Sequence, residues 1–238
     1  MTHAASLLTL LACGPARPEP TEPSSPAPLP AAVEAPASDL ARLQALTQAC
    51  DPLPGATRFK TDASRAEATV QLCRLEGAIW WRADADIDCD GAPDPRCAAD
   101  RTRRSETSAK TSTGAFINSA EVPYLVVPLP SNGFRPKAHG IKTGWSGYGS
   151  AGVILYGDAM VYAPYADAGP AGVIGELSYA AAVALGIDPD PNRSGVEGDV
   201  TYIVFTGDDA RVEPVESAAQ ARAVGERLLA RLLDRTGS

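Results

Sequence analysis

Two carboxyl side chains, Asp167 and Glu176, are the strongest candidates for acid–base chemistry in this sequence. They lie nine residues apart in YADAGPAGVIGELS, on either side of a loop rich in glycine and proline. We expect Asp167 at the end of a strand and Glu176 at the start of a helix, so that the loop brings both carboxylates to one cleft. Hydrolysis of a glycosidic bond uses two such groups, one as acid and one as base. A structural role is the alternative, because a glutamate in a first helical turn is favoured by the helix dipole alone.

A second acidic motif is the D-x-D-x-D-G run formed by Asp86, Asp88, Asp90 and Gly91. This spacing can direct three carboxylates toward one Ca²⁺ ion, with the glycine permitting the turn. The twelfth position of the motif is Cys97 rather than the bidentate glutamate of an EF-hand. Three interpretations stay open: a structural turn, a calcium loop, and an edge that binds a saccharide. We assign no metal ligand and no cofactor, and place the three aspartates in the substrate site.

Aromatic residues gather near these carboxylates in the sequence. Aromatic faces stack on sugar rings, although most aromatic side chains belong to the core. We expect Trp81 and Tyr165 to contact a substrate. The wider aromatic set is Trp80, Trp81, Trp145, Tyr148, Tyr162 and Tyr165.

Charge and histidine content exclude several other classes of function. The formal net charge is −8, which argues against binding nucleic acid and favours a cationic partner. The chain has two histidines, His3 and His139. That number argues against a histidine-rich metal site and against a Ser-His-Asp triad.

The amino-terminal residues are typical of an exported protein. The apolar stretch AASLLTLLA before Cys13 is too short to span a bilayer and fits a secretory signal, and Leu-Leu-Ala-Cys fits a lipobox with Cys13 as the lipidation site. We therefore predict a signal at 1–13, a proline-rich disordered linker at 14–38, and one catalytic domain at 39–238. The location would be the bacterial envelope, as a lipoprotein, or the exterior. A lipid anchor would be the only membrane contact, and we expect a monomer.

Four further cysteines agree with export, since disulfides are the default in an oxidising compartment. Proximity in the sequence favours Cys89 with Cys97, which leaves Cys50 with Cys73. A zinc site made by all four thiolates is the alternative, but no C-x-x-C pair is present.

The predicted elements place strands in the middle of the chain and helices at the ends, so the class is α+β. We expect a mainly β core, barrel-like, with a double-psi barrel as one form of it. Gly157-Asp158 should form a hairpin turn. The expected helices are 39–48, capped by Ser38 and apolar at Leu40, Leu43 and Leu46; 176–185, closed by Gly186; and 218–234, capped by Ser217 and apolar at Val224, Leu228, Leu229 and Leu232. The expected strands are 70–73, 78–81, 122–128, 153–156, 160–165 and 200–205.

Several blocks resemble the fungal-type chitosanases of glycoside hydrolase family 75. The blocks are CRLEGAIWWRADADIDCDGA from Cys73, VPYLVVPLP from Val122, GVILYG, and YADAGPAGVIGELSYAAAVALGI up to Ile187. The resemblance implies an exported endo-hydrolase that cleaves β-1,4 glucosaminyl links of chitosan with inversion. It places the essential pair at Asp167 and Glu176, and keeps the serine of the family pattern at Ser178, which we assign to the substrate site.

The sequence departs from that family at two neighbours of the aspartate. Ala166 and Ala168 stand where the family has Gly and Thr, so a hydroxyl that could orient the carboxylate is missing. A non-catalytic envelope lipoprotein that binds an amino-sugar polymer is therefore the alternative function, and a calcium-stabilised structural domain is a third. If Glu176 lies at a helix N-terminus, its pKa should be lowered, which suits a base and leaves Asp167 as the acid.

Overall fold

The computed structural model describes residues 37–193 and 195–236. The predicted signal, the lipidation site Cys13 and nearly all of the predicted linker lie outside the described residues. The helices and strands, in chain order, are α1 (Ala37–Leu46), β1 (Cys73–Leu75), β2 (Ala78–Asp88), β3 (Leu125–Pro128), β4 (Thr143–Gly144), β5 (Tyr148–Ser150), β6 (Gly152–Tyr156), β7 (Ala159–Tyr162), β8 (Tyr165–Gly169), β9 (Glu176–Ser178), α2 (Tyr179–Leu185), β10 (Val196–Phe205), β11 (Arg211–Val212) and α3 (Ala218–Thr236).

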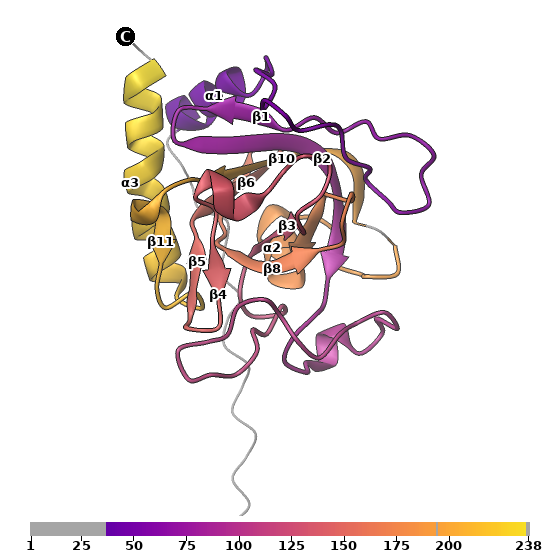
Figure 1. Cartoon of the computed structure of the whole chain (residues 1–238). Helices are drawn as coiled ribbons and strands as arrows, with labels where there is room; N and C mark the ends of the chain where they lie inside the picture. The colour runs from indigo at the N-terminus through magenta and orange to yellow at the C-terminus, as the bar shows by residue number, and fades with distance from the viewer. Residues whose placement is uncertain (1–36, 194, 237–238) are drawn as a thin grey trace, which may run out of the picture.

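An eight-stranded mixed sheet forms the body of the molecule (Figure 1). Its order is β7-β6-β10-β2-β9-β3-β8, and β1 also pairs with β2. The pairs β2–β9 and β3–β8 are parallel, and the other pairs are antiparallel. A smaller sheet has the order β11-β5-β4. The predicted α+β class with a mainly β core is confirmed, and the described strands form an open sheet rather than a closed barrel.

Strand β2 carries three aspartates near its carboxyl end, and Figure 1 shows it as a long, bent strand. Side chains alternate between the two faces of a strand. Ala83 and Ala85 lie in the main apolar core. Asp84, Asp86 and Asp88 therefore project from the opposite face of the same strand. The sequence had predicted only the first four residues of this strand, 78–81.

Helices α1 and α3 cover a second apolar cluster on the other side of the sheet. Leu43 of α1 packs there with Leu228 and Leu232 of α3, against Trp80 and Ile203 of the sheet. Figure 1 shows α3 along one flank of the molecule with α1 near its end. Both predicted apolar helix faces are confirmed.

The segment around Glu176 differs from the prediction. Glu176 lies on strand β9, and the helix begins only at Tyr179. Ser178 is the true N-cap, since its Oγ accepts a hydrogen bond from the Ala181 amide at 3.1 Å. The predicted closure at Gly186 is confirmed, and that glycine has a φ of +72°. The first helix also begins earlier than expected, so Ser38 lies inside it.

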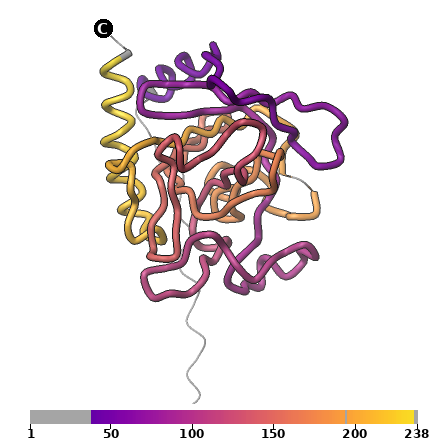
Figure 2. The backbone as a smooth tube through the Cα atoms, in the orientation of Figure 1, coloured from indigo at the N-terminus to yellow at the C-terminus, as the bar shows by residue number. Residues whose placement is uncertain are grey.

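Both predicted disulfides are confirmed. Cys50–Cys73 ties the segment after α1 to β1, and Cys89–Cys97 closes the loop that follows β2. These four thiols are therefore not available for the alternative zinc site. The chain trace in Figure 2 shows that the segment after β2 leaves the sheet and forms long loops at one end of the molecule. Among the described residues, no helix combines the length and apolar character that a bilayer crossing requires.

Candidate active site

A pocket of about 950 Å³ spans the adjacent strands β2, β9, β3 and β8. Asp167 of β8 and Glu176 of β9 both line it, as do Asp88 and Asp90. The remaining wall comes mainly from the loop at 100–108. The structure thus brings the two predicted catalytic carboxyl groups into one pocket, although a strand lies between theirs.

The glycine at position 169 fixes how these two side chains lie relative to each other. A Cβ atom on Gly169 would lie 2.5 Å from Glu176 Oε2, so the Glu176 carboxyl group covers that glycine. Asp167 and Gly169 are two residues apart on β8 and share a face, about 6.7 Å apart along the strand. The two carboxyl groups are therefore neighbours on one surface, and a side chain at position 169 would displace the Glu176 carboxyl group.

Asp167 is held by donors that stabilise its charged form. Its Oδ1 accepts hydrogen bonds from the Ser108 amide at 2.8 Å, the Ser108 hydroxyl at 3.0 Å and the Ala168 amide at 2.7 Å. Burial raises the pKa of Asp167 to about 6, and these hydrogen bonds from Ser108 and Ala168 oppose that rise. Ser108 thereby supplies an orienting hydroxyl that Ala168 cannot provide.

Glu176 is instead stabilised in its protonated form, because it is buried among other acidic groups. Burial first, and then the charges of Asp86 and Asp167, raise the pKa of Glu176 to about 8. The expectation of a lowered pKa was wrong, since it assumed a helix N-terminus and Glu176 lies on a strand. At neutral pH its side chain is therefore mostly protonated.

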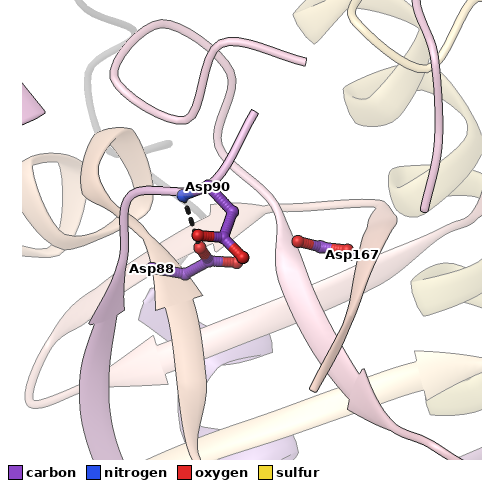
Figure 3. Close-up of side chains that lie close together, drawn as sticks. All are labelled: Asp88, Asp90 and Asp167. Atoms are coloured by element: carbon purple, nitrogen blue, oxygen red, sulfur yellow. Dashed lines mark hydrogen bonds between the residues drawn. The ribbon is translucent and has the colours of Figure 1, made fainter. Parts of the chain in front are cut away.

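Asp88 and Asp90 converge on Asp167 (Figure 3). One oxygen from each of the three lies within 4.8 Å of the others. Asp88 Oδ1 accepts from the Asp90 amide at 2.7 Å, and Asp90 Oδ1 accepts from the Arg104 amide. Burial and the charges of Asp167 and Glu176 raise the pKa of Asp88 well above its usual value. The three carboxyl groups could hold a hard cation, but they offer few of the six to eight oxygens that Ca²⁺ prefers.

A comparison with known families places the chain in one of them. The profile described as fungal chitosanase of glycosyl hydrolase group 75 matches residues 85–236, which include the whole β2–β9 acidic region from Asp86 onward. The chain belongs to this chitosanase family. Endo-chitosanase C of Aspergillus oryzae (strain ATCC 42149 / RIB 40) is 28% identical over 180 residues, which cover 72% of this chain and 44% of that relative. The chain thus spans less than half the length of the curated relative that it matches.

Three residues predicted to bind substrate do not reach the pocket of this chitosanase-family chain. Trp81 has no exposed surface and stacks on Tyr202, with ring centroids 5.4 Å apart. Tyr165 is buried in the same core. Ser178 is fully buried, where it caps α2 and donates to the Val122 carbonyl at 2.9 Å. These assignments were wrong because sequence proximity to the carboxylates does not show which face of a strand a side chain occupies.

The remaining predicted substrate residues divide between two places. Asp88 and Asp90 line the pocket, whereas Asp86 does not. Asp86 lies directly opposite Glu176 in the β2–β9 register, where burial and the charges of Asp62 and Glu197 raise its pKa to about 6. Asp86 therefore affects the pocket by raising the pKa of Glu176, and it does not line the pocket itself.

Sequence reasoning missed two residues that the structure places in this pocket. Trp145 lines it with 66% of its surface exposed, and it was noted among the aromatics but not chosen. Ser108 lies in the loop at 100–108, which belongs to none of the motifs or elements predicted from the sequence. The signal for Trp145 was its isolation among glycines and polar residues, which is atypical of a core tryptophan.

Proposed function

We propose that this chain is an endo-acting glycoside hydrolase that cleaves β-1,4 glucosaminyl links of chitosan with inversion. The observation that carries the proposal is that Asp167 and Glu176 line one pocket with different electrostatic surroundings. Membership of the chitosanase family supports the substrate class. The name of the Aspergillus relative supports it as well.

Glu176 is the general acid in this proposal. Its pKa of about 8 keeps a proton on the side chain at neutral pH, ready for transfer to the glycosidic oxygen of the leaving sugar. Asp167 is the general base. It is charged above pH 6, and its Oδ1 is occupied by three donors, so Oδ2 is the oxygen left to take a proton from water. These roles reverse those expected from the sequence.

The placement of the two groups supports inversion. Inverting enzymes separate their carboxyl groups by about 6.5–9.5 Å, which leaves room for the attacking water. Glu176 covers Gly169, and Gly169 is one same-face step from Asp167, a spacing of about 6.7 Å along the strand.

The charge of the pocket suits a polycationic chain. Six carboxyl groups and two guanidinium groups line it, and an acidic surface of this kind attracts chitosan more than neutral chitin. The Arg103 guanidinium donates to the Gly91 carbonyl, so it is engaged within the protein. The charged lining residues are Asp88, Asp90, Asp100, Arg103, Arg104, Glu106, Asp167 and Glu176.

Export is part of the same proposal. The two disulfides are typical of a protein that folds in an oxidising compartment, and a polymer such as chitosan is met outside the cytoplasm. We keep the lipid anchor at Cys13 and the monomeric state as predictions.

The test is hydrolysis of chitosan oligomers by the purified protein, with the anomer of the first product read by NMR. We expect the α-anomer from a β-link, and a loss of at least about a hundredfold in kcat for Glu176→Gln and Asp167→Asn. Glu226→Gln, on the exposed side of α3, removes one carboxylate outside the pocket and should keep wild-type activity. A β-anomer would refute inversion, and wild-type rates in both pocket variants would refute the assigned pair.

A non-catalytic binding protein is the second candidate. It rests on Ala166 and Ala168, which depart from the family pattern. The Ser108 hydroxyl counts against it, since it donates to Asp167 Oδ1 where the alanine cannot. Tight binding to chitosan with no release of reducing ends would favour this candidate over the hydrolase.

A further inference from the structure

A second pocket, of about 330 Å³, lies beside the polar face of β2. It is bounded by the Cys50–Cys73 disulfide, by Trp80 and Asp84 of β2, and by residues 197–199 of β10. Its volume falls at the small end of the range for pockets that bind small ligands. None of its lining residues belongs to the catalytic pocket.

Two polar groups in the wall of this pocket lack partners. Asp84 is 6% exposed and Trp80 is 4% exposed. Asp84 Oδ1 and Trp80 Nε1 are buried and have no hydrogen-bond partner among the described residues. A buried polar atom without a partner costs free energy, so an unpaired acceptor and an unpaired donor in one pocket indicate a ligand with both kinds of group.

Asp84 connects this pocket to the catalytic one. A Cβ atom on Gly175 would lie 2.0 Å from Asp84 Oδ1, so the carboxyl group packs on the backbone just before Glu176. Asp84, Asp86 and Asp88 lie on one face of β2, about 6.7 Å apart at each step. The acidic face of β2 therefore runs continuously from the second pocket, past Glu176, into the catalytic pocket.

The rim of the second pocket is also acidic. Glu197 and Asp199 line it, and Arg82 is the cationic lining residue. The Arg82 guanidinium donates to the Thr47 carbonyl at 3.2 Å, so it is engaged within the protein. Asp199 has a φ of +63°, at the point where the pairing of β10 with β2 shifts register. A non-glycine residue in this conformation is strained, and such strain is found often at ligand sites.

We propose that the second pocket is a subsite for one glucosaminyl unit of a bound chain, with Asp84 as the residue that receives its ammonium group. The inference rests on the proposed function and extends it, since it places the polymer along the polar face of β2. Asp84 Oδ1 and Trp80 Nε1 are buried in the free protein. The two side chains would therefore have to turn toward the pocket for a sugar ammonium to donate to Asp84 and for a sugar hydroxyl to accept from Trp80 Nε1.

The ion pair of Arg65 bears on access to this subsite. Arg65 donates to Asp62 at 3.2 Å and to Glu197 at 2.9 Å, and all three side chains are well exposed. Exposed pairs of this kind contribute little free energy, so a cationic sugar can compete with Arg65 for Glu197.

The experiment measures binding in a protein that cannot turn over substrate. Glucosamine dimer and hexamer are titrated calorimetrically into the Glu176→Gln variant, and into the same variant carrying Asp84→Asn, Glu197→Gln or the control Glu226→Gln. We expect Asp84→Asn to weaken hexamer binding about tenfold and to change dimer binding far less, because a short chain reaches one pocket only. Glu197→Gln should weaken hexamer binding by a smaller factor, and the control should match the parent.

Equal hexamer affinities for the Asp84→Asn, Glu197→Gln and Glu226→Gln proteins would overturn the subsite. So would an equal loss for dimer and hexamer, which would mean that Asp84 acts only through Glu176. Glu197 is exposed, so its variant tests the subsite even if Asp84→Asn fails to fold. Absence of chitosan cleavage by the wild type, with these length-dependent losses intact, would refute the proposed hydrolysis and leave the binding subsite standing.

Discussion

The hydroxyl of Ser108 lies 3.0 Å from Asp167 Oδ1, although 59 residues separate the two in the chain. The same hydroxyl accepts a hydrogen bond from the Ala168 amide at 3.1 Å, so its orientation is set by one bond that it donates and one that it accepts. Through this contact the loop at 100–108 takes part in the site, and the alanine after the aspartate does not leave its carboxylate unoriented.

Removing the Ser108 hydroxyl should raise the pKa of Asp167. We expect Ser108→Ala to lower kcat by about tenfold near neutral pH and to shift the acidic limb of the pH–rate profile upward, because the hydroxyl stabilises the charged carboxylate. Ser112→Ala is the matched control, since Ser112 bonds instead to Glu216, which does not line the pocket. An unshifted acidic limb would contradict the role given to Ser108.

The dependence of activity on pH follows from the two raised pKa values. Asp167 must be charged and Glu176 protonated, so we expect kcat for chitosan oligomers to rise through about pH 6 and fall through about pH 8. Initial rates measured from pH 4 to pH 10 would show this bell-shaped pH dependence. A rate that keeps increasing above pH 9 would show that Glu176 is not the acid.

Trp145 should act on binding rather than on chemistry. It is 66% exposed, and Lys110 Nζ lies 4.4 Å from its ring centroid. We expect Trp145→Ala to raise KM several-fold through lost stacking on a sugar, with little change in thermal stability, and Trp145→Phe to recover part of the loss. A large fall in the melting temperature would instead indicate a structural role.

Stability should fall as the pH rises from acid to alkaline. The pKa of Glu176 goes from 4.5 in the unfolded chain to about 8 in the folded protein, and that of Asp84 goes from 3.8 to about 7. Between these values the folded protein holds protons that the unfolded chain has lost, so the free energy of unfolding decreases with pH. Urea titrations at pH 5 and pH 8 measure the slope. Glu176→Gln should flatten it, and a stability that increases over this interval would exclude the buried, protonated state.

Chelation tests the calcium alternative. Asp88 and Asp90 each use one oxygen for a backbone amide, and Asp167 uses one for Ser108, so three oxygens stay available. Because this is about half of the Ca²⁺ ligand number, we expect EDTA to leave the melting temperature unchanged. A fall of several degrees that added Ca²⁺ reverses would support a structural calcium site.

Local pattern was sufficient for the features that depend on near neighbours in the chain. The spacing of the cysteines predicted both disulfides, and the leucine periodicity predicted the buried faces of α1 and α3. The acidic pair at Asp167 and Glu176 was also visible in the sequence, with a family resemblance that the profile match confirmed.

The tertiary structure decided which side chains share a surface and what surrounds them. Glu176 lies on β9 beside Asp86 because a parallel pairing joins segments ninety residues apart, and no local pattern contains that contact. The pairing buries Glu176 among carboxyl groups, which raises its pKa and makes it the proposed acid. Likewise Trp81 and Trp80 are adjacent in sequence but face opposite sides of β2, so one stacks in the core and the other lines a pocket.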